Sequence, residues 1–259
     1  MERVYIGIDI GSTCAKTVVL DGGRNILLRL LQPTGWSSVD TAEDIRARLA
    51  GEGFPVEEAA VVATGYGRVS VPYADRCVTE ITCHGRGACR IYGTPDLTVI
   101  DIGGQDTKII RIQDGAVSDF LMNDKCSAGT GRFLEIMANT LAVRPEELCG
   151  MAAHGGGTSI SSMCTVFAES EVISLIGRGE KRENIAFAVV DSIVKKVASQ
   201  AGRMSADQET VCLTGGLCEY PYLRQSLSAA LGRPVRTEAD GRYAGAVGAA
   251  LCAFSIRKA

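Results

Sequence analysis

The stretch YIGIDIGSTCAKTVVLDGG (residues 5–23) decides the fold, because LTVIDIGGQDTKIIRIQDG (residues 97–115) repeats its pattern at a constant offset of 92 residues. Each copy has an apolar run, then Asp-x-Gly, small polar residues, a Lys and a second apolar run. Apolar β-rich runs joined by a Gly-containing turn predict a β-hairpin. The shared Asp, Gly and Lys positions favour a duplicated lobe over chance similarity between two hairpins.

The segments around these hairpins fit an α/β fold. Short apolar runs over 61–65 and 211–216 end in Gly, as strands do when they deliver a loop to a ligand. Apolar residues at helical spacing predict helices over 133–141 and 184–203. The segment GAVGAALCAF (residues 245–254) predicts a helix whose Gly and Ala residues let it pack closely on a sheet.

The length of 259 residues corresponds to one or two domains. We expect a first lobe over residues 1–93, with the C-terminal helix 244–259 packing back on it, and a second lobe over 94–243. The chain is 46% hydrophobic and 22% charged, which is typical of a globular protein.

Charge, hydropathy and cysteine content limit the possible cellular location and the possible classes of partner. A formal net charge of -3 gives no basic footprint for nucleic acid. No run approaches the roughly 20 apolar residues that cross a membrane. The first residues lead directly into a predicted strand, and ten cysteines in so long a chain argue against a disulfide scaffold. We therefore expect a cytoplasmic protein whose thiols serve metal or redox chemistry.

The two predicted turns suit phosphate binding. A Gly-rich turn exposes backbone N–H groups that cradle phosphate oxygens. Asp9 and Asp101, which precede the turns, suit a water-bridged Mg²⁺ or the orientation of an attacking water. Thr214-Gly215-Gly216 allows close approach of a nucleoside. The absence of GxxxxGK[ST], and of GxGxxG after the first strand, argues against P-loop and Rossmann folds.

Cys126 and Cys164 each precede a predicted helix. A thiolate at a helix N-terminus is stabilised by N–H groups and the helix dipole, which is what a metal ligand needs. An iron–sulfur cluster usually takes four thiolates, and a two-fold dimer would supply them. Their spacing by itself fits better with two buried, hydrophobe-like cysteines.

Three motifs resemble those of the actin–Hsp70–sugar kinase superfamily. DIGST (9–13), DIGGQD (101–106) and LTGG (213–216) look like its phosphate-1, phosphate-2 and adenosine motifs. The resemblance implies a ribonuclease H-like, duplicated two-lobe α/β fold that binds ATP.

Four further segments resemble one branch of that superfamily. NDKCSAGTGRFLE (123–135) and SSMCTVFAESEVISL (161–175) are similar to the cluster-binding segments of 2-hydroxyacyl-CoA dehydratase activators. ATGYGR (63–68) and VTEITCHGRGA (78–88) also look like that group, which includes the ATPase subunits of benzoyl-CoA reductase. The resemblance therefore runs nearly the whole length of the chain.

This resemblance implies a homodimer with one bridging [4Fe–4S] cluster, in which each protomer binds ATP or ADP with Mg²⁺. Cys126 and Cys164 would be the cluster ligands, and Asp9, Asp101 and Gln105 would serve ATP hydrolysis. The implied nucleotide-binding residues are Gly11, Ser12, Thr13, Cys14, Lys16, Gly103, Gly104, Gln105, Asp106, Gly129, Gly131, Gly215, Gly216 and Arg242. Arg242 stands where relatives often carry Gln and is a departure from the family pattern.

The implied activity is ATP-dependent one-electron donation, fed by a ferredoxin or flavodoxin, that activates an iron–sulfur (R)-2-hydroxyacyl-CoA dehydratase. An alternative is the ATPase electron donor of a benzoyl-CoA reductase or of another double-cluster reductase. Two further alternatives keep the fold: a small-molecule kinase, or a regulatory ATPase without a cluster. The implied partners include neither nucleic acid nor membrane.

The remaining cysteines fit structural roles. Cys77, Cys83, His84 and Cys89 lack the tight Cys-x₂₋₄-Cys spacing of a structural zinc site. Cys212 and Cys218 flank the Thr-Gly-Gly turn, where a buried position is expected.

Overall fold

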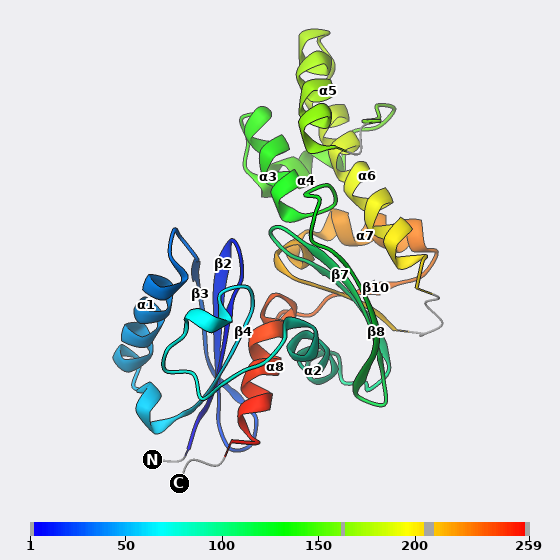
Figure 1. Ribbon diagram of the computed structural model, residues 1–259. Coiled ribbons are helices and arrows are strands. Elements are labelled where there is room, and N and C mark those ends of the chain that lie inside the picture. Colours follow the sequence, from blue (N-terminus) through cyan, green and yellow to red (C-terminus); the bar gives the residue numbers. More distant parts are fainter. Residues whose placement is uncertain (1–2, 162–163, 205–209, 257–259) are drawn as a thin grey trace. The chain divides into compact units, whose positions relative to one another are not determined.

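The computed structural model describes residues 3–161, 164–204 and 210–256 (Figure 1). It divides into two compact units. Unit 1 comprises Met1–Asp96, Arg111–Ser118 and Asp240–Ala259, and unit 2 comprises Leu97–Ile110 and Asp119–Ala239. The first and last few residues of the expected first lobe, 1–2 and 257–259, lie outside the described residues.

Unit 1 contains a five-stranded sheet with the order β3-β2-β1-β4-β5. The central strand β1 pairs antiparallel with β2, in the expected hairpin, and parallel with β4. Apolar residues fill β1, β2 and β4, which are almost wholly buried. The strands are β1 (Tyr5–Ile10), β2 (Cys14–Leu20), β3 (Ile26–Pro33), β4 (Ala60–Thr64) and β5 (Arg76–Cys77).

Helices cover both faces of this sheet. The apolar face of α1 (Ser38–Gly51) packs on β1 and β4, while α2 (Glu80–Tyr92) and α8 (Ala244–Ala253) contribute to the cores on the other face. A Cβ on Gly7 of β1 would lie 2.0 Å from the Ala246 carbonyl oxygen. The predicted close packing of the small-residue helix is therefore confirmed. The single-turn helices of the chain are η1 (Val56–Glu58), η2 (Arg68–Ser70), η3 (Gly216–Glu219) and η4 (Gly241–Tyr243).

The second sheet repeats the strand plan of the first, with the order β10-β9-β6-β7-β8. Strand β6 takes the place of β1, with β7 on one side and the parallel strand β9 on the other. This match confirms the duplication inferred from the two hairpins. The strands are β6 (Leu97–Ile102), β7 (Thr107–Gln113), β8 (Ala116–Asn123), β9 (Val211–Thr214) and β10 (Val235–Arg236).

Unit 2 packs its helices around one continuous core that includes β6, β7 and β9. The predicted apolar face of α6 is confirmed, because Ile185, Val189, Ile193 and Val197 are all fully buried. The helices are α3 (Gly131–Thr140), α4 (Pro145–Ala152), α5 (Thr165–Gly177), α6 (Arg182–Ala201) and α7 (Pro221–Leu231). Across the described parts of the chain, every helix is too short or too polar to span a membrane.

Candidate functional site

The first Gly-rich turn connects β1 to β2 in unit 1. The Gly11 N–H donates to the Cys14 carbonyl at 3.2 Å, and the Thr34 hydroxyl donates to the Gly11 carbonyl at 2.7 Å. Ser12 and Thr13 at the tip are exposed, and Lys16 and Cys14 are half-buried. The turn is thus held at its base and open at its tip, as anion binding requires.

The second turn, between β6 and β7, has the same backbone plan. The Gly103 N–H donates to the Asp106 carbonyl at 2.9 Å, which reproduces the Gly11–Cys14 bond at the repeat offset. Gly104 is half-buried and Gln105 is exposed. Both predicted phosphate turns therefore exist as equivalent closed turns with an accessible tip.

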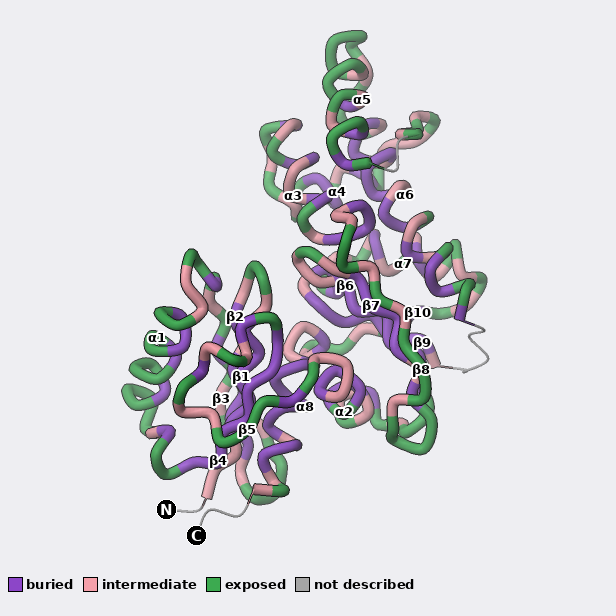
Figure 2. Tube along the Cα trace, in the orientation of Figure 1, coloured by how far each residue is buried: buried purple, intermediate pink, exposed green. Residues whose placement is uncertain are grey.

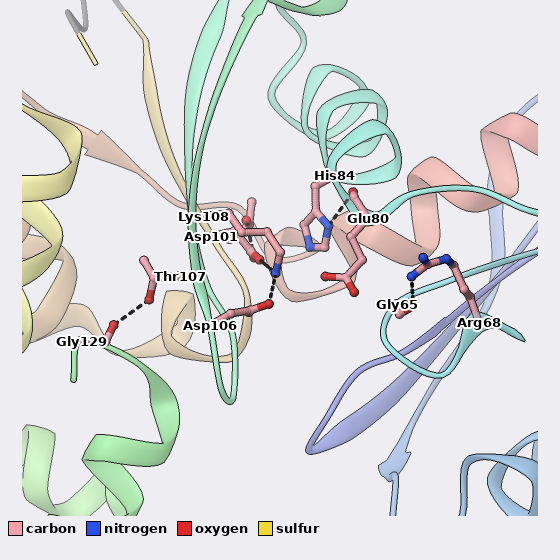
Figure 3. A network of polar contacts seen from close by, with 10 residues as sticks. Gly65, Arg68, Glu80, His84, Asp101, Asp106, Thr107, Lys108 and Gly129 are labelled. Carbon is pink, nitrogen blue, oxygen red and sulfur yellow. Dashed lines mark hydrogen bonds and ion pairs between the residues drawn. The ribbon is translucent and has the colours of Figure 1, made fainter. Parts of the chain in front are cut away.

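A buried aspartate stands at the carboxyl end of the central strand of each sheet. Asp9 is 5% and Asp101 2% exposed. Asp101 Oδ1 accepts a hydrogen bond from the Thr214 hydroxyl at 2.9 Å, and its Oδ2 lies 3.5 Å from Lys108 Nζ (Figure 3). Burial of such carboxylates costs free energy unless partners compensate for it. These two partners supply that compensation for Asp101.

Lys108 contacts two of the candidate site residues, although the sequence prediction did not include it. Its ammonium group lies 2.7 Å from Asp106 Oδ2 as well as beside Asp101, and its side chain is only 3% exposed (Figure 3). The signal is present in the repeat, because Lys108 aligns with Lys16, one of the predicted nucleotide-binding residues. Lys108 thereby links the aspartate of β6 to the last residue of the phosphate turn.

A second pair of equivalent glycines follows the parallel strands β4 and β9. Gly65 and Gly215 have φ values of +89° and +82°. A Cβ would lie 2.4 Å from the Ile10 carbonyl oxygen at Gly65, and 2.3 Å from that of Ile102 at Gly215. Because Gly215 has no side chain, the backbone after β9 can pack directly against β6. A Cβ on Gly216, by contrast, would meet open space. The equivalence of Gly65 and Gly215 was not predicted, although the dipeptide Thr-Gly stands at the end of both strands.

The C-terminal helix brings another glycine to Asp9. A Cβ on Gly245 would lie 2.5 Å from Asp9 Oδ2 and 2.9 Å from His84 Cε1. The His84 ring is buried, with Nδ1 3.1 Å from the Glu80 carbonyl oxygen. His84 therefore lies beside the aspartate of the first turn. Arg242, the departure noted in the sequence, is half-buried in η4.

The two cysteine segments of unit 2 meet through their neighbouring hydroxyls. Ser127 Oγ and Thr165 Oγ1 are 2.7 Å apart, although 38 residues separate them in sequence. Each hydroxyl belongs to the residue directly after a cysteine, Cys126 or Cys164. Cys164 is exposed and Cys126 half-buried, so the alternative of two buried cysteines is wrong.

The expected helix N-terminal position holds for one cysteine only. Cys164 is the N-cap residue of α5. Cys126 precedes α3 by a turn in which the Thr130 hydroxyl donates to the Ser127 carbonyl at 2.6 Å, and Thr130 is the N-cap. The predicted order at Cys126, a thiol followed by a Gly turn and then a helix, is confirmed, with Gly129 at φ +85° in the turn and Thr130 rather than Cys126 as the N-cap.

The same segment braces the second phosphate turn. The Gly131 N–H donates to the Gly103 carbonyl at 2.9 Å, and the Arg132 N–H to the Gly104 carbonyl at 2.7 Å. The Thr107 hydroxyl donates to the Gly129 carbonyl at 2.7 Å (Figure 3). A continuous series of hydrogen bonds therefore joins the phosphate turn to the residues around both cysteines.

The other residues considered as metal ligands do not form a metal site in the part of the chain that the structure describes. Within residues 3–161, 164–204 and 210–256, no three His, Cys, Asp or Glu side chains gather as a metal site. Cys77 is exposed and Cys83 is buried. Cys212 and Cys218 are buried, as expected.

Comparison with known proteins identifies the family. The family model described as "BadF/BadG/BcrA/BcrD ATPase family" matches residues 6–253. The chain belongs to this ATPase family. The chain is also 40% identical, over 258 residues and 98% of both chains, to the (R)-2-hydroxyglutaryl-CoA dehydratase activating ATPase of Acidaminococcus fermentans. Its identity to a benzoyl-CoA reductase component of Thauera aromatica is 29%, over 96% of this chain and 92% of that protein.

Solved structures support the same family assignment. The activator of 2-hydroxyisocaproyl-CoA dehydratase from Clostridium difficile, with bound ADPNP, matches with a TM-score of 0.89 and 37% identity, covering 97% of this chain and 94% of that one. A ROK family glucokinase from Streptomyces griseus, 16% identical, matches with a TM-score of 0.63 over 98% of this chain and 100% of its own. The fold is that of the actin–Hsp70–sugar kinase superfamily, and the protein is an ATP-binding ATPase.

Proposed function

We propose that this ATPase is an ATP-dependent one-electron donor that activates a (R)-2-hydroxyacyl-CoA dehydratase. The observation that carries the proposal is the series of hydrogen bonds from the Gly103–Asp106 turn, through Gly129 and Gly131, to the residues beside Cys126 and Cys164. A kinase of the same fold has no need for such a connection between a phosphate turn and two thiols. The greater identity to the dehydratase activator than to the benzoyl-CoA reductase component favours a dehydratase as partner.

The chain's own groups account for nucleotide binding. The N–H groups of the two Gly-rich turns bind phosphate oxygens. The buried carboxylates of Asp9 and Asp101 suit a Mg²⁺ ion held through water, since that ion keeps much of its hydration shell. Gln105, exposed at the tip of the second turn, orients the attacking water.

The cysteine residues fit an iron–sulfur cluster shared between two chains. Thiolates are the usual ligands of such clusters, and four are needed. Cys126 and Cys164 are held near each other by Ser127 and Thr165, so one chain contributes two thiolates and a two-fold partner contributes the others. When bound, a [4Fe–4S] cluster supplies one electron at a time.

An exposed apolar surface on α5 supports this homodimer. Val166, Phe167 and Ile173 are 67%, 66% and 56% exposed, and the helix is mostly green in the burial view (Figure 2). All three follow Cys164 within three turns of helix. Large apolar side chains gathered on one exposed helix mark an interaction surface. A second copy of the chain, seated on this helix, brings the four cysteines together.

Nucleotide energy acts through the position of the cysteine segment. A ligand shifts a conformational equilibrium only by its different affinity for the two states. The carbonyl groups of Gly103 and Gly104 accept hydrogen bonds from the first residues of α3. A change in the turn when phosphate is bound or lost is therefore passed to the start of α3 and to the Cys126 segment. A ferredoxin or flavodoxin in the cytoplasm supplies the electron.

Anaerobic purification tests the proposal. We expect about two iron atoms per chain and an electron paramagnetic resonance signal after reduction. Cys126→Ala and Cys164→Ala remove the iron and keep ATP binding, whereas the control Cys77→Ala, at another exposed thiol, keeps both. Iron-free protein after anaerobic reconstitution, or iron retained in both variants, would contradict the assignment.

A further inference from the structure

Two thiols of unit 1, Cys83 on α2 and Cys252 on α8, have no part in the function proposed above. They are 0% and 1% exposed and belong to the same apolar cluster. The two helices touch at their backbones, because a Cβ on Gly248 would lie 1.7 Å from the Cys83 carbonyl oxygen. Cys252 lies four residues after Gly248, one turn along the same face of α8. Both thiols therefore lie at this contact between the two helices, in one apolar cluster.

Arg86 places a positive charge on this pair. Its Nη1 donates to Cys252 Sγ at 3.3 Å, and the exposed Arg86 side chain belongs to the same helix as Cys83. Cys252 lies in the last turn of α8, where the helix dipole by itself disfavours an anion. The guanidinium group opposes that effect.

The charge distribution favours a thiolate at one sulfur of the pair. Hydrogen bonding from Cys83, and then the charge of Arg86 and Arg76, lower the pKa of Cys252. The hydrogen bond to Cys252 and burial raise the pKa of Cys83. The pair thus consists of a nucleophilic sulfur and a neighbouring thiol that can resolve it, which is the arrangement of oxidisable dithiols.

Cys149 provides a comparison within the same chain. It is also buried, at 4% exposure, and burial raises its pKa to about 12. That shift includes a smaller contribution from the negative charge of Glu146. Burial by itself therefore makes a thiol inert in this protein, and the positive charge and the second sulfur distinguish Cys252.

We propose that Cys83 and Cys252 form an oxidation site that reacts with hydrogen peroxide and ends as a disulfide between α2 and α8. The Cys252 thiolate attacks one peroxide oxygen and the O–O bond breaks, giving a sulfenic acid and hydroxide. The Cys83 sulfur then attacks the Cys252 sulfur. The S–S bond forms, the S–O bond breaks, and the leaving hydroxide takes the Cys83 proton as water. Two thiols lose two electrons in total, and peroxide is reduced to water.

Peptide mapping of the full chain tests this site. Tryptic cleavage leaves Cys77 and Cys83 on the peptide 77–86 and Cys252 on 243–257, so Cys77→Ala is the background in which the link is assigned. After a short peroxide pulse under argon and alkylation, we expect the Cys83–Cys252 linked peptide while Cys149 stays alkylated. Cys149 oxidised as fast as Cys252, or Cys252 linked to another cysteine, would overturn the proposal.

Two variants separate the roles of charge and resolving thiol. At a pH below the pKa of Cys252, Arg86→Gln is expected to slow loss of the Cys252 thiol about tenfold, since a rise of one pKa unit lowers the thiolate fraction by that factor there. Cys83→Ala is expected to leave Cys252 as sulfenic acid or higher oxides, with no disulfide. Unchanged oxidation of Cys252 in Arg86→Gln would contradict the role of the charge. These readouts need no iron, so they stand apart from the test of the proposed function.

Discussion

The phosphate turns of the two units share one backbone plan, yet different elements brace them. In unit 1 the turn at Gly11 is held by Thr34, which follows β3. In unit 2 the turn at Gly103 is held by the start of α3, directly after the Cys126 segment. Duplication thus supplied two equivalent turns, and among the described residues hydrogen bonds join only the second to the segments of Cys126 and Cys164. Under the proposed function, unit 2 is therefore the part in which nucleotide state reaches the cysteines.

The largest predicted difference between the two turns concerns their lysines. Lys108→Met leaves Asp101 and Asp106 without their buried cation and is expected to destabilise the fold by about 3–5 kcal/mol. The matched Lys16→Met, at a half-buried lysine, is expected to cost less than about 1 kcal/mol. Denaturant unfolding of both variants measures the difference. Equal losses would show that the two lysines have the same role.

The glycines after β4 and β9 are expected to respond alike. Gly65→Ala and Gly215→Ala each force a Cβ against a strand carbonyl at positive φ, with an expected loss of about 2–4 kcal/mol. Gly22→Ala, where the added Cβ meets open space, is the control and should change stability by less than about 0.5 kcal/mol. Thermal and denaturant unfolding give the comparison. A tolerated substitution at only one of the first two positions would break their equivalence.

A smaller difference in stability is predicted between substitutions of two buried threonines. Thr107→Val removes the hydrogen bond to the Gly129 carbonyl and is expected to cost about 1–3 kcal/mol. Thr17→Val is the control on β2, since the Thr17 hydroxyl has no hydrogen-bond partner among the described residues, and it should be neutral or stabilising.

The same two variants also test the connection to the thiols. In Thr107→Val we expect amide hydrogen exchange to rise at 126–131, and in Thr17→Val we expect no change there. Unchanged exchange in Thr107→Val would mean that this bond does not hold the cysteine segment.

Sequence patterns predicted the parts of this molecule that local chemistry specifies. The two hairpins, the buried face of α6 and the small-residue helix α8 follow from periodicity and composition, and all are present. The repeat also contained the signal for Lys108, and the Thr-Gly that ends the runs 61–65 and 211–215 contained that for Gly65, but neither pattern showed which residue makes a close contact.

The remaining features depend on contacts between distant segments. The bonds from Thr107 to Gly129 and from Ser127 to Thr165 join residues 22 and 38 positions apart, and no spacing rule indicates them. The N-cap of α3 is Thr130 rather than Cys126, because Gly129 at φ +85° places a turn between the thiol and the helix. Tertiary packing, rather than propensity, settles these points.

Native mass spectrometry of anaerobically purified protein tests the central claim most directly, that each chain holds half of one metal site. We predict a species with the mass of two chains plus one Fe₄S₄ unit, lost in Cys126→Ala. A cluster carried by a single chain, or chains that stay iron-free after anaerobic reconstitution, would contradict the account.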